Sequence, residues 1–294
     1  MESKTPSIID LDAELAKLTM FRGLTPQTKR AERRGSGTQL GSYRDGILIA
    51  GKSAGTSHWE THPDDELVHV LDGTKTLEIV CDDGPPKSFV LRAGMIAVVP
   101  QGAWHRFRSA EGGTTWSATL PGDHIELDVD DPRTVEPRKV IASGMPSIVD
   151  LDAELAKLTM FRGRTPQSTM AERKGSAARL ASYRDGGLGI TKFAGKGHWE
   201  AHLAGDELIH VLDGAATLEI LGEDGPQSFA LRAGMIAVNP QGAWHRFQSS
   251  EGVTLMAATP FPSEVIELDV DDPRTVARGR RGLHSHRIRA ASRP

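Results

Sequence analysis

The sequence repeats itself, and this duplication constrains the fold more than any other feature. Residues 7–23 return as residues 147–163 with a single change. Each copy is long enough to form a hydrophobic core of its own. We therefore expect two domains of one fold, at residues 1–143 and 144–276. A basic tail at residues 277–294 lacks apolar periodicity and is expected to be disordered.

Within each copy, short alternating apolar runs are separated by Gly, Asp and Pro, which is typical of antiparallel strands. In the second copy the expected strands are residues 179–183, 188–194, 198–202, 207–212, 216–221, 228–231, 235–239, 244–249 and 254–259. Asp213-Gly214 predicts a tight turn between two of them. So many short strands favour a closed or double-sheet barrel, because closure removes exposed sheet edges.

A short amphipathic helix is expected before each barrel. Asp10 is a good N-cap for residues 11–18, in which Leu11, Leu15 and Leu18 follow helical spacing. These leucines are expected to pack on the barrel, and so are Met20 and Phe21 of the following segment.

Composition narrows the classes of partner. A net charge of −4 is too mild to indicate a nucleic acid or a membrane surface, and we expect neither. The chain has no apolar run of about 18 residues, the length that a membrane span needs. Its first ten residues lack the apolar core of a signal peptide, so a cytoplasmic protein is expected. The single cysteine, Cys81, is replaced by Gly222 in the second copy, which argues against a catalytic thiol.

Eight of the eleven histidines form two matched sets: His58, His62, His69 and His105, and His198, His202, His210 and His245. Glutamates accompany them, and imidazole nitrogen and carboxylate oxygen are ligands of first-row metals. Side chains two apart on a strand share a face, so His58, Glu60 and His62 lie on one face. One ion can be held by adjacent rungs only, which are either His58 with Glu60 or Glu60 with His62.

At this point the sequence resembles the cupin superfamily, whose first motif reads G(X)5HXH(X)3,4E(X)6G and whose second reads G(X)5PXG(X)2H(X)3N. Glu66 precedes Gly73 at the spacing that ends motif one, which selects Glu60 and His62 as the preceding pair. Motif two fits from Gly94 to His105, and both motifs recur in the second copy. The ligands that the resemblance implies are Glu60, His62, Glu66 and His105 in the first copy and Glu200, His202, Glu207 and His245 in the second.

The chain departs from the family pattern at three positions, one of which is the opening glycine of motif one, which comes one residue late at Gly55 and Gly195. The first histidine of motif one is Glu60 or Glu200, and the closing asparagine of motif two is Ser109 or Ser249. The resemblance therefore implies one divalent ion per barrel in a shell of two histidines and two glutamates. The extra carboxylate favours harder ions such as Fe(II) or Mn(II), while Zn and Ni remain candidates.

The family also implies the architecture, which is all-β with tandem double-stranded β-helix barrels of the jelly-roll type, each with a short N-terminal helix. Single-domain cupins commonly pair, so the two copies are expected to form an intramolecular pseudo-dimer, with further homo-oligomers possible. For the basic tail, the alternative to disorder is a functional role, such as incidental metal binding through His284 and His286.

Other residues near the ligands have competing interpretations. His58 and His198 share the face of the ligands and are candidates for hydrogen bonding to them, for acid–base chemistry or for replacing a ligand. The alternative for both is a half-exposed histidine at the barrel mouth. His69 and His210 are expected on the opposite face, and Arg106 and Arg246 in surface ion pairs. Phe107 and Phe247 share the face of the downstream histidines and can line a cavity.

Retention of all four ligands in both copies favours a metal-dependent enzyme on a small organic substrate. A dioxygenase-like reaction is preferred over isomerisation or decarboxylation. The alternative is a non-catalytic, metal-dependent protein that binds or senses a small molecule. A storage protein is disfavoured, because the storage bicupins that this architecture resembles generally lose these ligands.

Overall fold

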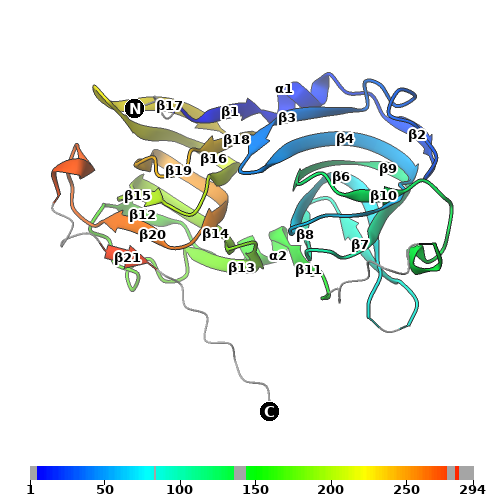
Figure 1. The fold of residues 1–294 in the computed structure, drawn as a ribbon. Helices are drawn as coiled ribbons and strands as arrows, with labels where there is room; N and C mark the ends of the chain where they lie inside the picture. Colours follow the sequence, from blue (N-terminus) through cyan, green and yellow to red (C-terminus); the bar gives the residue numbers. More distant parts are fainter. Residues whose placement is uncertain (1–4, 83, 136–143, 277–281, 285–294) are drawn as a thin grey trace, which may run out of the picture. The chain divides into compact units, whose positions relative to one another are not determined.

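The structure, a computed structural model, describes residues 5–82, 84–135, 144–276 and 282–284. The chain divides into two compact units, Ile9–Ala156 and Lys157–Pro294 with Met1–Ile8. One sheet has ten strands and the other has eleven, and the helices are short (Figure 1). The expected all-β fold with two barrels is confirmed. The boundary at residues 143/144 and the pseudo-dimer stay predictions.

The ten-stranded sheet is built mainly from the first copy of the repeat. Its strands are β2 Phe21–Leu24, β3 Gly37–Tyr43, β4 Gly46–Thr56, β5 Trp59–Thr61, β6 Glu66–Ile79, β7 Lys87–Arg92, β8 Met95–Val99, β9 His105–Thr119, β10 Asp123–Ile125 and β11 Ser147–Asp150. The central path runs β10-β5-β9-β6-β8-β11, and β4 joins it through β9. A short 3₁₀ helix, Pro132–Thr134, follows the sheet.

The eleven-stranded sheet repeats this order with the second copy. Its strands are β1 Ser7–Asp10, β12 Phe161–Arg164, β13 Ala177–Tyr183, β14 Gly186–Lys196, β15 Trp199–His202, β16 Glu207–Gly222, β17 Gly225–Arg232, β18 Met235–Asn239, β19 His245–Pro260, β20 Ser263–Ile266 and β21 Gly282–His284. The central path runs β1-β18-β16-β19-β15-β20-β21. A 3₁₀ helix, Pro273–Thr275, matches the one in the first copy.

Long bent strands replace several of the expected short ones. The tight turn predicted at Asp213-Gly214 is wrong, because both residues lie inside β16, where the pairing with β19 shifts register. Gly214 has a φ of 75°, and a Cβ there would lie 2.2 Å from the carbonyl oxygen of Gly252. The glycine therefore allows a bulge at which β16 bends without ending.

Each helix is shorter than expected and follows a strand that the pattern did not indicate. α1 spans Leu11–Ala16 and α2 spans Leu151–Leu155, and the Asp10 carboxylate accepts from the backbone N–H of Ala13 as the predicted N-cap. Leu11 is 2% exposed, whereas Leu15 is only half-buried. β11 immediately precedes α2 and pairs with β8 in an antiparallel register.

The basic tail is described only in part. Gly282–His284 forms β21, which pairs with β20, and so these three residues depart from the expected disorder. The backbone groups at the edge of β20 provide the pairing partners for this strand. The rest of the tail, including His286, lies outside the described residues. Within the described ranges, no helix is both long and apolar enough to cross a membrane.

Tryptophans adjacent to the site residues pack into the barrel cores. Trp59 and Trp199 are fully buried, and their indole N–H groups donate to the carbonyls of Val129 and Val270 at 2.9 and 2.8 Å. The surface ion pairs expected for Arg106 and Arg246 are wrong, because both arginines are buried. Their guanidinium groups lie 4.5 and 4.3 Å from the two tryptophan rings.

Burial of these arginines is possible because each has a carboxylate partner. Arg106 pairs with Glu78 on β6, and Arg246 pairs with Glu219 on β16. A buried guanidinium without such a partner would carry a large desolvation cost.

Candidate metal centres

Strand pairing brings the candidate ligands together from distant parts of the sequence. Glu60 on β5 lies directly opposite His105, the first residue of β9, and Glu200 on β15 lies opposite His245 in the same way. Directly opposed side chains on antiparallel strands project from the same face with closely spaced Cβ atoms. The sheet register therefore sets one carboxylate beside one imidazole in each barrel.

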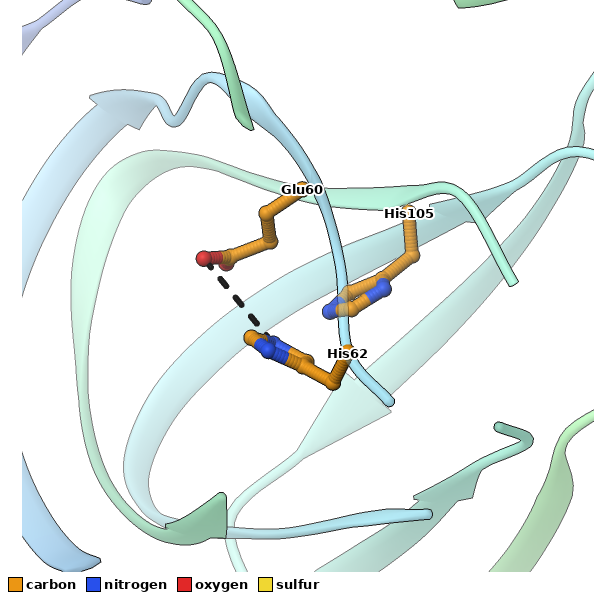
Figure 2. A group of neighbouring side chains, drawn as sticks. All are labelled: Glu60, His62 and His105. Atoms are coloured by element: carbon orange, nitrogen blue, oxygen red, sulfur yellow. Dashed lines mark ion pairs between the residues drawn. The ribbon is translucent and has the colours of Figure 1, made fainter. Parts of the chain in front are cut away.

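In the first barrel, three donors converge. Atoms of Glu60, His62 and His105 all lie within 4.8 Å of one another (Figure 2). His62 Nε2 is 4.0 Å from Glu60 Oε2 and 3.9 Å from Glu66 Oε2. Glu66 Oε2 also lies 3.0 Å from His105 Nε2. Glu60, His62 and His105 thus converge, Glu66 contacts both histidines, and His58 is outside the group of three.

The second barrel repeats this arrangement. Glu200, His202 and His245 form the matching group of donors within 4.8 Å. Glu207 contacts both histidines, with Oε1 at 3.3 Å from His202 Nε2 and Oε2 at 3.0 Å from His245 Nε2. The predicted residues are again brought together.

Backbone contacts orient one histidine in each group. His105 Nδ1 lies 3.0 Å from the carbonyl oxygen of Ala103, and His245 Nδ1 lies 3.0 Å from that of Ala243. A carbonyl only accepts, so Nδ1 carries the proton and Nε2 faces the neighbouring carboxylates. This tautomer leaves Nε2 as the nitrogen that can bind a metal ion.

The residues fit a divalent ion. Both ring nitrogens of His62 are buried and lack a hydrogen-bond partner in the described part of the chain. A buried imidazole without partners is costly, and an ion at Nε2 would satisfy one nitrogen. Two imidazoles and two carboxylates are also a donor set that first-row metals accept.

Electrostatics keep the glutamates ionised. Burial alone would raise the pKa of Glu60, but the hydrogen bond from His58 and the charges of His105, His58 and His62 outweigh it and lower that pKa to about 2. The pKa of Glu200 is lowered to about 2 against a similar effect of burial, chiefly by the hydrogen bond and charge of His198. Burial opposes the charged form of His105, yet its hydrogen bond to Glu66 raises the pKa.

His58 and His198 contact Glu60 and Glu200, the glutamates that stand in place of the family's first histidine. Nε2 of His58 is 3.4 Å from Glu60 Oε2, and Nε2 of His198 is 3.5 Å from Glu200 Oε2. His58 is 23% exposed and His198 is 6% exposed, so the half-exposed alternative describes only the first. The ring of His124, which the sequence reasoning missed, lies 5.0 Å from that of His58.

Support for the ligands differs between the barrels. In the second barrel Glu207 accepts from Thr259 Oγ1 at 2.7 Å and from Asn239 Nδ2 at 3.1 Å, and Ser263 Oγ lies 2.8 Å from His202 Nδ1. The corresponding residues of the first barrel are Thr119, Val99 and Gly122. Thr119 donates instead to the carbonyl of Leu120 at 3.3 Å. In the sequence, this difference in hydrogen bonding is visible only when the two copies are aligned and compared at these positions.

A cavity of about 510 Å³ opens beside the second site, and it includes His198, Glu200 and Glu207 in its wall. Phe247 lines it as expected, at 6.1 Å between its ring centroid and that of His245. Arg164 and Arg173 also line it, and the sequence reasoning did not identify them.

Within the described residues, His69, His210 and Ser109, which the sequence analysis also named, lie outside the two groups of converging donors. His69 and His210 are each 4% exposed. Ser109, at the position of the family's closing asparagine, donates to the carbonyl of Thr74 at 2.6 Å and accepts from Gly112 N–H at 3.0 Å. This serine stabilises the bend in β9.

Comparisons with known proteins agree with this geometry. Residues 48–115 match the family model described as Cupin domain. Salicylate 1,2-dioxygenase from Pseudoaminobacter salicylatoxidans is similar in structure, with a TM-score of 0.55 and 12% identity over 87% of this chain and 81% of that one. A cupin 2 conserved barrel domain protein from Leptotrichia buccalis is similar with a TM-score of 0.51 and 12% identity, over 89% of this chain and 98% of that one.

A variant of oxalate decarboxylase from B. subtilis gives a TM-score of 0.50 at 12% identity, over 76% of this chain and 73% of that one. No curated protein sequence matches the chain. Residues 48–115 thus form a cupin domain. The two barrels, each with its histidine–glutamate group, fit a tandem arrangement of two cupin barrels, as in a bicupin.

Proposed function

We propose that this protein is a metal-dependent bicupin enzyme that acts on a small organic substrate. Each barrel would hold one divalent ion, through Glu60, His62, Glu66 and His105 in the first and Glu200, His202, Glu207 and His245 in the second. The observation that carries the proposal is the convergence of three donors within 4.8 Å in both barrels. Retention of both groups after duplication supports a chemical role for them.

A dioxygenase-like reaction is the best-supported class. The cavity beside the second site has a volume of about 510 Å³, and its wall includes Phe193, Phe247 and Phe261. Such a wall suits a substrate with a ring or another apolar portion, which oxalate lacks. The salicylate dioxygenase of similar fold was solved as adducts with gentisate, an aromatic molecule.

The chain's own residues would position the substrate and hold protons. A bound divalent ion would supply a Lewis acid and, with Fe or Mn, a redox centre. Glu200 and Glu207 balance the charge of such an ion. His198 holds Glu200 and also lines the cavity, so it can keep a proton beside the substrate.

Elemental analysis of protein purified without chelator tests the proposal. We expect one ion per barrel, and we expect His62→Ala to remove the ion of the first barrel only. His58→Ala is the matched control and should keep both ions, because His58 lies outside the converging group. Full metal content in the His62→Ala variant would contradict the ligand assignment. Oxygen consumption with catechols, diketones and hydroxyketones then tests the reaction class.

A further inference from the structure

We propose that the cavity of the second barrel recognises an organic carboxylate through Arg164 and Arg173, with apolar walls around the rest of the ligand. This inference rests on the proposed function and adds the substrate class. Arg164 ends β12, and Arg173 lies in the segment between β12 and β13. Both line the cavity that also contains Glu200 and Glu207.

Within the described residues, neither arginine forms an ion pair with a carboxylate. Both side chains are half-buried, and their Nε atoms are buried without a hydrogen-bond acceptor in the described residues. Arg173 Nη2 instead lies 3.2 Å from the sulfur of Met170, a weak acceptor.

The contrast with the buried arginines of the same protein is informative. Arg246 is buried too, but it is paired with Glu219. A guanidinium group removed from water without a carboxylate is costly, so proteins seldom leave one unpaired unless a ligand supplies the anion. Arg164 and Arg173 meet this condition at their buried Nε atoms, and both line a cavity.

The two guanidinium groups also repel one another. Burial, followed by the charge of Arg173, lowers the pKa of Arg164 to about 10, so Arg164 stays charged at neutral pH. Two like charges in one cavity wall favour an anion between them. Glu200 offsets only part of this charge, and a divalent ion in the proposed site would neutralise that carboxylate.

The cavity wall is shaped around Arg164. Its guanidinium carbon lies 4.4 Å from the centroid of the Phe193 ring. A Cβ on Gly197 would lie in ordinary contact with that carbon, at 3.6 Å, so this position borders the guanidinium group. The ring and the charged group thus form one wall, with an apolar surface beside a donor of several N–H groups.

The first barrel lacks this wall. Leu24, Ser53 and Ser57 occupy the positions of Arg164, Phe193 and Gly197. Arg33 retains the position of Arg173, but Leu24 replaces its partner arginine. The repeat therefore provides a natural control, in which the proposed ligands are kept and the carboxylate-binding pair is lost.

Size and chemistry point to a single-ring carboxylate or a ligand of similar bulk. The volume of about 510 Å³ is within the range of small-molecule sites. Arginine binds carboxylates in a planar, bidentate manner, which orients a flat ligand. The carboxylate would lie at Arg164 and Arg173, and the apolar portion would lie along Phe193 and Phe247.

Titration calorimetry with benzoate and its neutral analogue benzamide tests the proposal on the full, metal-loaded chain. We expect benzoate to bind at least about tenfold more tightly than benzamide, as for other charge-assisted contacts. Arg164→Leu, which introduces the residue of the first barrel, and Arg173→Gln should each weaken benzoate binding by about tenfold or more. Arg33→Gln is the matched control and should leave it unchanged.

Two further measurements, benzoate binding after chelator treatment and after Arg164→Leu, distinguish the carboxylate site from the proposed metal site. Arginine-dependent benzoate binding that persists after chelator treatment would support the carboxylate site even if metal analysis fails. Binding that is lost on metal removal but unaffected by Arg164→Leu would mean that benzoate ligates the ion, and this would overturn the proposal. Equal binding of benzamide, or no benzoate binding to the folded chain, would also overturn it. Arg164→Lys keeps the charge and should retain part of the affinity, which controls for misfolding.

Discussion

Ser263 Oγ lies 2.8 Å from Nδ1 of His202, whereas the equivalent histidine of the first barrel, His62, has no such partner. The hydroxyl fixes the orientation of the His202 ring and directs Nε2 toward Glu207. In the first barrel the position of Ser263 is occupied by Gly122, where a Cβ would lie 1.8 Å from the carbonyl oxygen of Thr61. The two centres share their donors but differ in how firmly these are held.

Replacing Ser263 by glycine should weaken the second metal site. The variant removes the hydrogen bond to His202 Nδ1, and loss of such a contact behind a metal ligand typically costs about 10–100-fold in affinity. Competition with a chromophoric chelator measures this, in a chain that also carries His62→Ala so that only the second site is loaded. Unchanged affinity would show that Ser263 does not orient His202.

The hydroxyl of Thr259 should matter where that of Thr119 does not. Thr259 donates to Glu207 Oε1 at 2.7 Å, while Thr119 donates to the carbonyl of Leu120 at 3.3 Å. Thr259→Val should therefore reduce metal affinity in the second barrel by about tenfold. Thr119→Val should leave the first site unchanged, since its hydroxyl does not contact Glu66.

The same chelator competition applies to both valine variants, each in a chain whose other site is disabled. Equal losses from the two substitutions would mean that volume or packing, and not the hydrogen bond to Glu207, determines the affinity.

Acid should destabilise the second barrel through His210. Burial lowers the pKa of His210 to about 4, from 6.5 for an exposed histidine. Between pH 6.5 and 4 the unfolded chain binds a proton at this histidine and the folded chain does not. The free energy of unfolding therefore has its full value above pH 6.5 and declines as the pH falls toward 4. The loss at pH 5 is on the order of 2 kcal/mol.

Urea unfolding at pH 7 and pH 5, with chelator present, measures this loss. The His210→Gln variant cannot titrate at this position and should lose less stability than the parent between the two pH values. Parallel losses in both proteins would assign the acid sensitivity to other groups.

The first helix should be anchored by Leu11 more than by Leu15. Leu11 is 2% exposed, and Leu11→Ala should lower the free energy of unfolding by about 2–5 kcal/mol because it leaves a cavity. Leu15 is half-buried, so Leu15→Ala should cost less than half as much. Chemical denaturation of the two variants provides the comparison, and metal content should be unchanged in both. The reverse ranking would contradict the packing of α1.

The sequence alone was sufficient to predict the repeat and the all-β fold, and its resemblance to the cupin motifs indicated the residues that converge in each barrel. These properties depend on local regularities. Side chains two apart share a strand face, which links Glu60 to His62, and Gly and Pro mark where strands end or bend. The resemblance to the cupin motif, in which Glu66 and Gly73 have the family spacing, then selected His62 over His58, and His62 lies in the converging group.

Tertiary structure decided what surrounds those ligands. Asp213-Gly214 has the composition of a turn, but pairing with β19 makes it a bulge within β16. Arg164 and Ser263 lie far from Glu200 in sequence, and only the closure of the barrel brings them to the same site. The physical reason is that register and strand order arise from long-range pairing. Side chains carried by the partner strands therefore become neighbours through contacts that no local pattern encodes.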